Sequence, residues 1–233
     1  MANLYLIPVP LGDTDLHHVI PCSQEEIIRR ISFFVVEDIR TARRFLKKTD
    51  KDTDIDRLHF YELNEHTAAA DLHSCLEPAL SGHDLGLMSE AGCPGVADPG
   101  ADLVKLAHEK GIRVIPLVGP SSILLAMMAS GMNGQNFAFN GYLPVKKEEK
   151  LRRIQFLEKR IFQENQSQLF IEAPYRNLQL FDDLLANCSS ATRLCIACDL
   201  TLDTEFIQTR SIGEWKKQKP DIQKRPAIFI LGK

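Results

Sequence analysis

The chain has 233 residues, which is enough for one large or two smaller α/β domains with a full core. Hydrophobic residues make up 44% of it and charged residues 25%, an ordinary composition for a soluble globular protein. The formal net charge of −3 gives no overall attraction for nucleic acid, so contact with RNA would need a local basic patch. No secretory signal and no membrane-spanning apolar run is found, so we expect a cytoplasmic protein without a membrane partner.

The predicted elements of the first half alternate between strand and helix. Buried apolar runs predict strands at 4–7, 33–36, 58–61, 85–88 and 112–116. Helical spacing predicts helices after a capping box at Ser23 and Glu26, after Asp38, up to about Leu80, over 101–110 and over 123–128. This order favours an α/β fold whose first sheet is mostly parallel.

The loop Ser89–Gly100 joins the strand at 85–88 to the helix at 101–110. Its three glycines allow positive φ and close approach of the backbone, while Pro94 and Pro99 make the loop rigid. Ligands of open α/β sheets usually bind beside such loops, at the carboxyl ends of strands. A rigid connection without a ligand is the alternative.

Acidic and then basic residues follow the strand at 33–36. Glu37 and Asp38 stand at its carboxyl end, and Arg40, Arg43 and Arg44 come next in a helix. This order suits a substrate that carries hydroxyl and phosphate groups. The same residues are also explained by an acidic helix start followed by a solvated basic face. Likewise, Glu65 beside a histidine belongs either to a base or metal site or to a helix cap.

A turn rich in glycine and asparagine at 131–136 suggests a change of domain, giving predicted domains at 1–134 and 135–233. The second half predicts strands at 137–139, 169–171, 193–198, 204–208 and 226–231, with helices at 146–163 and 177–187. Because strands dominate toward its end, we expect a mixed second sheet.

The six cysteines are scattered, as expected of reduced thiols in a cytosolic protein. Cys195 and Cys198 have a metal-site spacing, but in a strand an odd spacing sends the two side chains to opposite faces. No second pair completes a zinc site, so we predict core thiols and no metal. The chain also lacks the G-x-G-x-x-G and Walker motifs, which leaves a ligand held by several Pro/Gly loops of two domains.

Eight sequence motifs occur in a fixed order along the chain, at 4–13, 36–40, 89–100, 116–122, 129–131, 139–144, 172–176 and 199–201. In this order they resemble the motifs of the tetrapyrrole-methylase-like, class III S-adenosylmethionine-dependent methyltransferases. Within these, the chain is most similar to the subfamily that methylates a ribose 2′-hydroxyl of small-subunit ribosomal RNA, methyltransferase I. Several motifs depart from that subfamily: it usually reads S-D-A-G-T-P where this chain has S-E-A-G-C-P.

The resemblance implies two α/β domains with a cofactor cleft between them, and a homodimer. Small residues and backbone groups would bind S-adenosylmethionine without a charged side chain. The cofactor-binding positions that it implies are Ser89, Ala91, Gly92, Pro94, Val96, Asp98, Ser121 and Ser122 in the first domain and Leu143, Ala173, Leu200, Thr201 and Ala227 in the second.

A ribose hydroxyl acceptor needs help with its proton. We expect Glu37 or Asp38 to accept or orient that proton, with Glu90 and Glu65 as further candidates. Arg40, Arg43 and Arg176 are expected to hold phosphate groups of the RNA. Two alternatives stay open: methylation of a tetrapyrrole or another small molecule, and a homologue that binds the cofactor without catalysis.

Overall fold

The computed structural model describes residues 2–63 and 71–233. The chain forms two compact units, which divide between Ser121 and Ser122. Each unit has its own sheet and its own hydrophobic core. Among the described residues, every helix is too short or too polar to cross a membrane.

The first unit contains a five-stranded sheet in the order β3-β2-β4-β1-β5, and all of its strand pairs are parallel. The prediction of a mostly parallel sheet is confirmed, and β2 and β4 have the predicted bounds. The strands are β1 Asn3–Leu6, β2 Phe33–Val36, β3 His59–Glu62, β4 Leu85–Met88 and β5 Arg113–Pro116.

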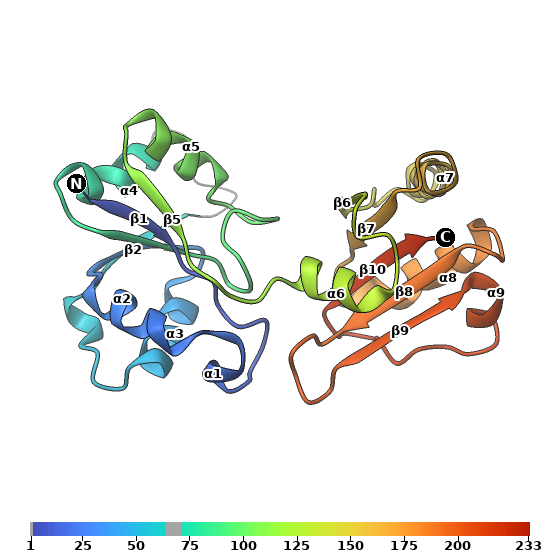
Figure 1. The fold of residues 1–233 in the computed structure, drawn as a ribbon, viewed down its shortest axis with the longest axis horizontal. Coiled ribbons are helices and arrows are strands. Elements are labelled where there is room, and N and C mark those ends of the chain that lie inside the picture. The colour runs from blue at the N-terminus through green and yellow to red at the C-terminus, as the bar shows by residue number, and fades with distance from the viewer. Residues whose placement is uncertain (1, 64–70) are drawn as a thin grey trace. The chain divides into compact units, whose positions relative to one another are not determined.

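Helices cover both faces of this sheet (Figure 1). On one face lie α1 Leu16–Val19, α2 Glu25–Arg30 and α3 Ile39–Thr49; on the other lie α4 Asp71–Leu80 and α5 Ala101–Glu109. The chain therefore leaves β1 and β2 toward one face and leaves β4, which lies between them, toward the other. Crevices for ligands form at the carboxyl ends of strands where such a switch occurs.

The second unit contains a mixed sheet in the order β6-β7-β10-β8-β9, as predicted. Only β6 and β7 pair in parallel among the described strand pairs of this sheet, and the others are antiparallel. The strands are β6 Phe137–Tyr142, β7 Ser167–Ile171, β8 Arg193–Cys198, β9 Phe206–Ser211 and β10 Ala227–Gly232.

The core of the second unit lies under α7 Lys147–Glu164, α8 Asn177–Asn187 and α9 Ile212–Trp215. The helix α6 Ser122–Ser130 packs against β8, β9 and β10. By its contacts α6 thus belongs to the second unit, whereas the sequence placed it within the domain 1–134; those domain limits stay a prediction.

Cys195 and Cys198 of β8 are free thiols, and both are fully buried. Of these two, Cys198 packs in the described core cluster under the helices and Cys195 does not. Burial raises the pKa of Cys195 and raises that of Cys198 to about 11. They are inert core thiols, as the odd spacing in a strand indicated.

The capping box predicted at Ser23 and Glu26 is wrong. A 3₁₀ turn, Cys22–Gln24, precedes α2, and the residue before α2 is Gln24, which forms no side-chain cap among the described residues. Instead, the buried Gln24 side chain donates a hydrogen bond to the carbonyl of Val118 at 2.6 Å. A tertiary contact has replaced the local one.

Candidate functional site

Three loops meet at the edge of the first sheet where the strands β1, β2 and β4 end. Val9 and Gly92 exchange two backbone hydrogen bonds of 3.0 Å, which join the loop after β1 to the loop after β4. The Glu37 carboxylate, after β2, accepts a hydrogen bond from the backbone N–H of Glu90 at 3.2 Å. We expected ligand contacts at these loops from the sequence. The structure shows that hydrogen bonds join the three loops to one another.

The loop Ser89–Gly100 requires glycine at Gly92, where φ is +75° and a Cβ would lie 3.3 Å from the Leu11 side chain. Ala97 also has a positive φ, of +62°, which costs energy for a residue with a Cβ. Cys93 donates to the carbonyl of Pro120 at 3.4 Å. Burial and the nearby Asp98 raise the pKa of Cys93, so its thiol is a structural contact and a poor nucleophile.

Several acidic side chains lie around the same loops, and their pKa values are shifted in opposite directions. The backbone N–H of Thr41 donates to Asp38 at 2.7 Å, and this hydrogen bond lowers the pKa of Asp38. Burial, followed by repulsion from Glu37 and Asp38, raises the pKa of Glu90. Burial and Glu37 raise the pKa of Asp98 to about 6, although the Ser89 hydroxyl opposes this shift. Asp38 is thus the helix cap and a weak base, whereas Glu90 is a stronger one.

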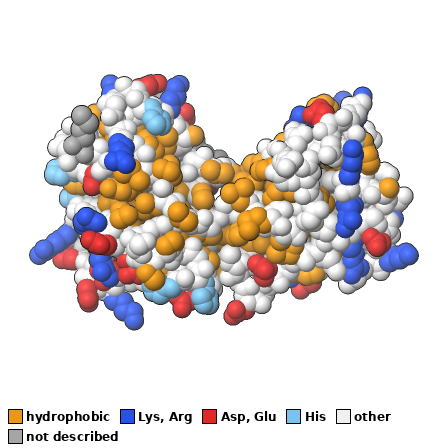
Figure 2. Space-filling view, in the orientation of Figure 1, with side chains coloured by type: hydrophobic (Ala, Val, Ile, Leu, Met, Phe, Trp, Pro, Cys, Tyr) orange, Lys and Arg blue, Asp and Glu red, His pale blue; other side chains and the backbone are white. Residues whose placement is uncertain are grey.

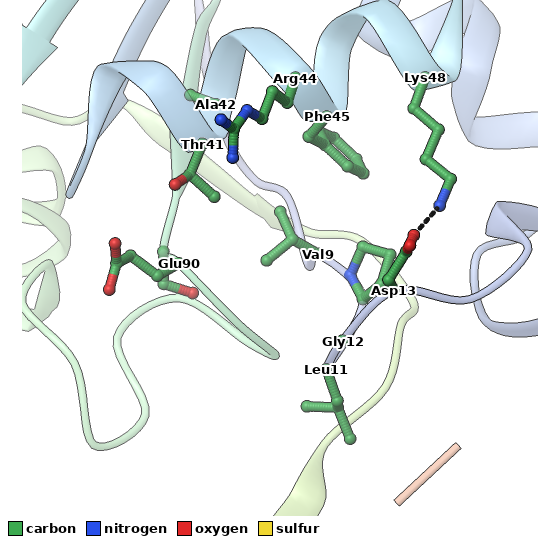
Figure 3. Close-up of a pocket in the computed structure, with 12 residues that line it drawn as sticks. Val9, Leu11, Gly12, Asp13, Thr41, Ala42, Arg44, Phe45, Lys48 and Glu90 are labelled. Atoms are coloured by element: carbon green, nitrogen blue, oxygen red, sulfur yellow. Dashed lines mark hydrogen bonds and ion pairs between the residues drawn. The ribbon is translucent and has the colours of Figure 1, made fainter. Parts of the chain in front are cut away.

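A groove with a volume of about 490 Å³ opens between α3 and these loops (Figure 3). Five residues of α3 line one side, and the loop after β1 lines the other. The lining residues are Val9, Pro10, Leu11, Gly12, Asp13, Thr41, Ala42, Arg44, Phe45, Lys48, Ser89 and Glu90.

Side chains of both charges lie at each end of the groove. At one end, Lys48 pairs with Asp13 at 3.0 Å and donates to the carbonyl of Thr14 at 2.6 Å. Figure 3 shows the guanidinium group of Arg44 on the same side of α3 as Thr41 and Glu90. The arrangement can hold a molecule that has an anionic group and a hydroxyl group a short distance apart.

Of the predicted residues on α3, Arg40 and Arg43 are not among the described residues that line this groove. Arg43 lies over the ring of Phe60 in β3, with 5.5 Å from its guanidinium carbon to the ring centroid. Figure 2 shows Lys, Arg, Asp and Glu side chains interspersed over the region of α2 and α3. Most of the basic helix face is therefore solvated, and Arg44 is the arginine directed into the groove.

The cofactor-binding positions predicted in the second unit all lie at one edge of its sheet. Leu143, Ala173 and Leu200 follow the ends of β6, β7 and β8, and Ala227 begins β10, paired with the end of β8. Thr201 has φ of +72°, and its hydroxyl oxygen is buried without a hydrogen-bond partner among the described residues. A buried hydroxyl in that state fits a site whose ligand supplies the partner.

The remaining predicted residues lie elsewhere. Arg176 donates to the buried Glu172 carboxylate at 2.6 Å, so its charge is already paired within the second unit. Ser121 and Ser122 stand where the two units divide, in the segment that follows β5. Glu65 lies outside the described residues.

The comparisons with known proteins give a consistent result, although no family model matches the chain. A ribosomal RNA small subunit methyltransferase I of Streptococcus pyogenes is 33% identical over 213 residues, which cover 91% of this chain and 70% of that protein. The chain belongs to the small-subunit ribosomal RNA methyltransferase I family. The family member of Vibrio cholerae is 29% identical over 231 residues, covering 98% of this chain and 76% of that protein.

Solved structures share the fold. The methyltransferase CobJ matches with a TM-score of 0.66 at 14% identity, covering all of this chain and 94% of that chain. Uroporphyrin-III C-methyltransferase of Thermus thermophilus, solved with S-adenosylhomocysteine, matches with a TM-score of 0.61 at 14% identity over 100% and 98% of the two chains. The expected tetrapyrrole methylase fold is therefore confirmed, and the chain is a methyltransferase by homology.

Proposed function

We propose that the chain transfers a methyl group from S-adenosylmethionine to a ribose 2′-hydroxyl of small-subunit ribosomal RNA. The observation that carries this proposal is the similarity of nearly the whole chain to curated methyltransferases I from several bacteria. The groove supports it, because its lining combines the cations Arg44 and Lys48 with the carboxylate of Glu90, groups that suit the phosphate and the hydroxyl of a nucleotide.

The cofactor would be held by backbone groups of the loop Ser89–Gly100 and by the edge of the second sheet that carries Leu143, Ala173, Leu200, Thr201 and Ala227. When bound, S-adenosylmethionine supplies a methyl group on a sulfonium centre that is already activated for transfer. The unpartnered hydroxyl of Thr201 and the positive φ of Gly92 fit a ligand that is recognised at close range.

The chain's own residues would then align the acceptor, exclude water and receive its proton. Glu90 lines the groove and has a raised pKa, which makes it the best placed proton acceptor. Glu37 would orient Glu90 through the backbone hydrogen bond, and Asp38 would hold the start of α3. Alignment of this kind can lower the activation free energy by roughly 7–11 kcal/mol.

Arg44 and Lys48 would bind the phosphate next to the acceptor ribose. Lys48 already has a carboxylate partner, Asp13, so Arg44 is the cation with its charge available to substrate in this groove, as far as the described lining residues go. A homodimer and a cytoplasmic location belong to the same proposal, and sedimentation or light scattering of the purified protein tests the dimer.

The experiment is calorimetry with S-adenosylmethionine, followed by transfer of a labelled methyl group to small ribosomal subunits that lack the modification. Stoichiometric binding and incorporation into RNA are expected. Absence of cofactor binding would contradict methyl transfer altogether. Cofactor binding without incorporation into competent subunits would contradict the ribosomal acceptor and favour a small-molecule substrate, for which a tetrapyrrole is the comparison.

A further inference from the structure

Three side chains of different chemistry meet on the surface of the first unit, outside the groove. His17 of α1, Cys22 of the following 3₁₀ turn and Glu25 of α2 place one ligand atom each within 4.8 Å of one another. His17 Nδ1 lies 3.2 Å from Cys22 Sγ and 3.5 Å from Glu25 Oε1. The imidazole nitrogen is thus at the centre of the group.

The fold fixes the backbone that carries these side chains. Asp15 caps α1 by accepting from the N–H of His17 at 3.0 Å. Leu16, Ile20 and Ile28, which lie within a few residues of the three in the sequence, are buried in one core cluster. The side chains that remain on the outside are therefore held in register by the core beneath them.

A further contact orients the Glu25 carboxylate. Arg29 donates to Oε2 of Glu25 at 3.3 Å, and the same arginine pairs with Asp50 at 3.0 Å. The other oxygen, Oε1, faces His17. Carboxylates that bind metals are commonly oriented in this way by an outer partner on the second oxygen.

We propose that His17, Cys22 and Glu25 bind one Zn²⁺ ion, which joins α1 to α2 and leaves a fourth position to water. With Zn–S near 2.3 Å and Zn–N and Zn–O near 2.0–2.2 Å, tetrahedral ligand atoms lie about 3.3–3.6 Å apart. The two observed separations from His17 Nδ1 are 3.2 and 3.5 Å. Thiolate, imidazole and carboxylate together suit zinc better than magnesium or calcium.

This site is independent of the proposed methyl transfer, because none of its three residues is among the described residues that line the groove. The prediction of no metal rested on the absence of a second cysteine pair. The spacings of five and three residues between His17, Cys22 and Glu25 match no common zinc-site pattern, so only the folded structure brings these ligands together.

The test titrates ZnCl₂ into metal-free, reduced full-length protein in a calorimeter, and compares Cys22→Ser, His17→Ala and the control His18→Ala. We expect one ion per chain, at least tenfold weaker binding in the first two variants, and unchanged binding in the control, whose histidine is the exposed neighbour on α1. Cobalt binding should give thiolate charge-transfer absorption that Cys22→Ser abolishes.

Zinc binding that is equal in all four proteins, or no binding in the parent protein, would overturn the proposal. The second result would mean that Cys22 and His17 form only a hydrogen bond. Because circular dichroism can confirm that these surface variants are folded and no step measures methyl transfer, failure here is distinguishable from failure of the proposed function.

Discussion

Individual carboxylates at the carboxyl edge of the first sheet differ in what they can do, although the sequence presents Glu37 and Asp38 as equivalent. One carboxylate oxygen of Asp38 accepts a hydrogen bond from the backbone N–H of Thr41. Glu90 comes from a different strand end and reaches the groove. The order of these residues in the sequence could not rank the carboxylates, because their ranking depends on tertiary burial and on hydrogen bonds.

Replacement of Glu90 by Gln tests the ranking. The variant removes the proton acceptor but keeps the shape and the backbone bond to Glu37, so methyl transfer should fall by about 10²- to 10⁴-fold. The matched variant Asp38→Asn should remain close to the parent, because asparagine is an equally good helix cap. Turnover with small ribosomal subunits and calorimetry with the cofactor are the measurements. A large loss in Asp38→Asn with normal turnover in Glu90→Gln would reverse the assignment.

Replacement of Arg44 by Ala should weaken binding of the RNA substrate while cofactor affinity stays the same. Arg43→Ala is the control, since that guanidinium lies over Phe60 and away from the groove lining. Loss of one phosphate contact should raise KM several-fold. It should also reduce the slope of the logarithm of the binding constant against the logarithm of salt concentration by about 1. Equal effects of the two substitutions would indicate a diffuse basic surface in place of a defined phosphate site.

Replacement of Asp98 by Asn should change how stability depends on pH. Asp98 has a pKa of about 6 in the folded protein, above its ordinary value of 3.8. The folded state therefore holds more protons than the unfolded state between these values, so the parent protein loses stability as pH rises through the window. The group is only partly buried, and solvent screening limits the effect to about 1 kcal/mol.

Urea unfolding at pH 4 and pH 7 measures this difference. Asp98→Asn should match the parent at the lower pH and exceed it in free energy of unfolding at the higher pH. A variant that is less stable than the parent at pH 7 would show that the carboxylate makes a favourable contact when ionised.

At the scale of elements, strands were easier to predict than short helices. The bounds of β2 and β4 came directly from continuous apolar runs, because both strands are buried on two faces. In contrast, α1 and α9 have four residues each, too few for a helical period to be seen. The strand β6 continues beyond residue 139, where the predicted strand ends. A register shift between Phe139 and Tyr142, with Gly141 at φ of +61°, lets Tyr142 pair with Ile171.

The capping-box pattern shows the limit of local reasoning. It was assigned at Ser23 and Glu26, where Gln24 is drawn into a tertiary contact. The structure forms a reciprocal box at Ser211 and Glu214 instead. On α3, the predicted phosphate-binding residues were Arg40 and Arg43, whereas Thr41, Arg44 and Lys48 line the groove; their spacing of three and four residues places these three on one helix face. Here the sequence did contain the signal.

The loops after β1 and β5 are expected to tolerate no side chain at Gly119. A Cβ there would lie 2.3 Å from Cβ of Pro8, whose ring cannot rotate away. Gly119→Ala should therefore cost about 1–3 kcal/mol and displace the loop that lines the groove. Gly134→Ala, with no described atom within 4 Å of its added Cβ, is the control and should change stability by less than about 0.5 kcal/mol. Thermal unfolding compares the two, and equal melting temperatures would contradict the close approach.

At the scale of the whole molecule, the two units should unfold as separate cooperative bodies. The chain has one tryptophan, Trp215, which is 1% exposed, packs edge-on against Phe181 and donates to the carbonyl of Leu194 at 2.9 Å. Its fluorescence reports on the second unit, whereas far-ultraviolet circular dichroism reports on both. If each core folds by itself, the two urea transitions will not coincide.

Core substitutions in each unit make this prediction specific. Phe181→Ala should lower the free energy of unfolding of the second unit by about 3–5 kcal/mol and move the fluorescence transition to lower urea concentration. The part of the circular dichroism transition that comes from the first unit should not move. Leu87→Ala, at a buried position of β4 in the first unit, should do the reverse and leave the fluorescence midpoint unchanged. If both variants shift one coincident transition, the units are thermodynamically coupled. In that case the interaction free energy of the two units must exceed the difference between their individual free energies of unfolding. Only an interaction of that size makes two cores unfold in one cooperative transition.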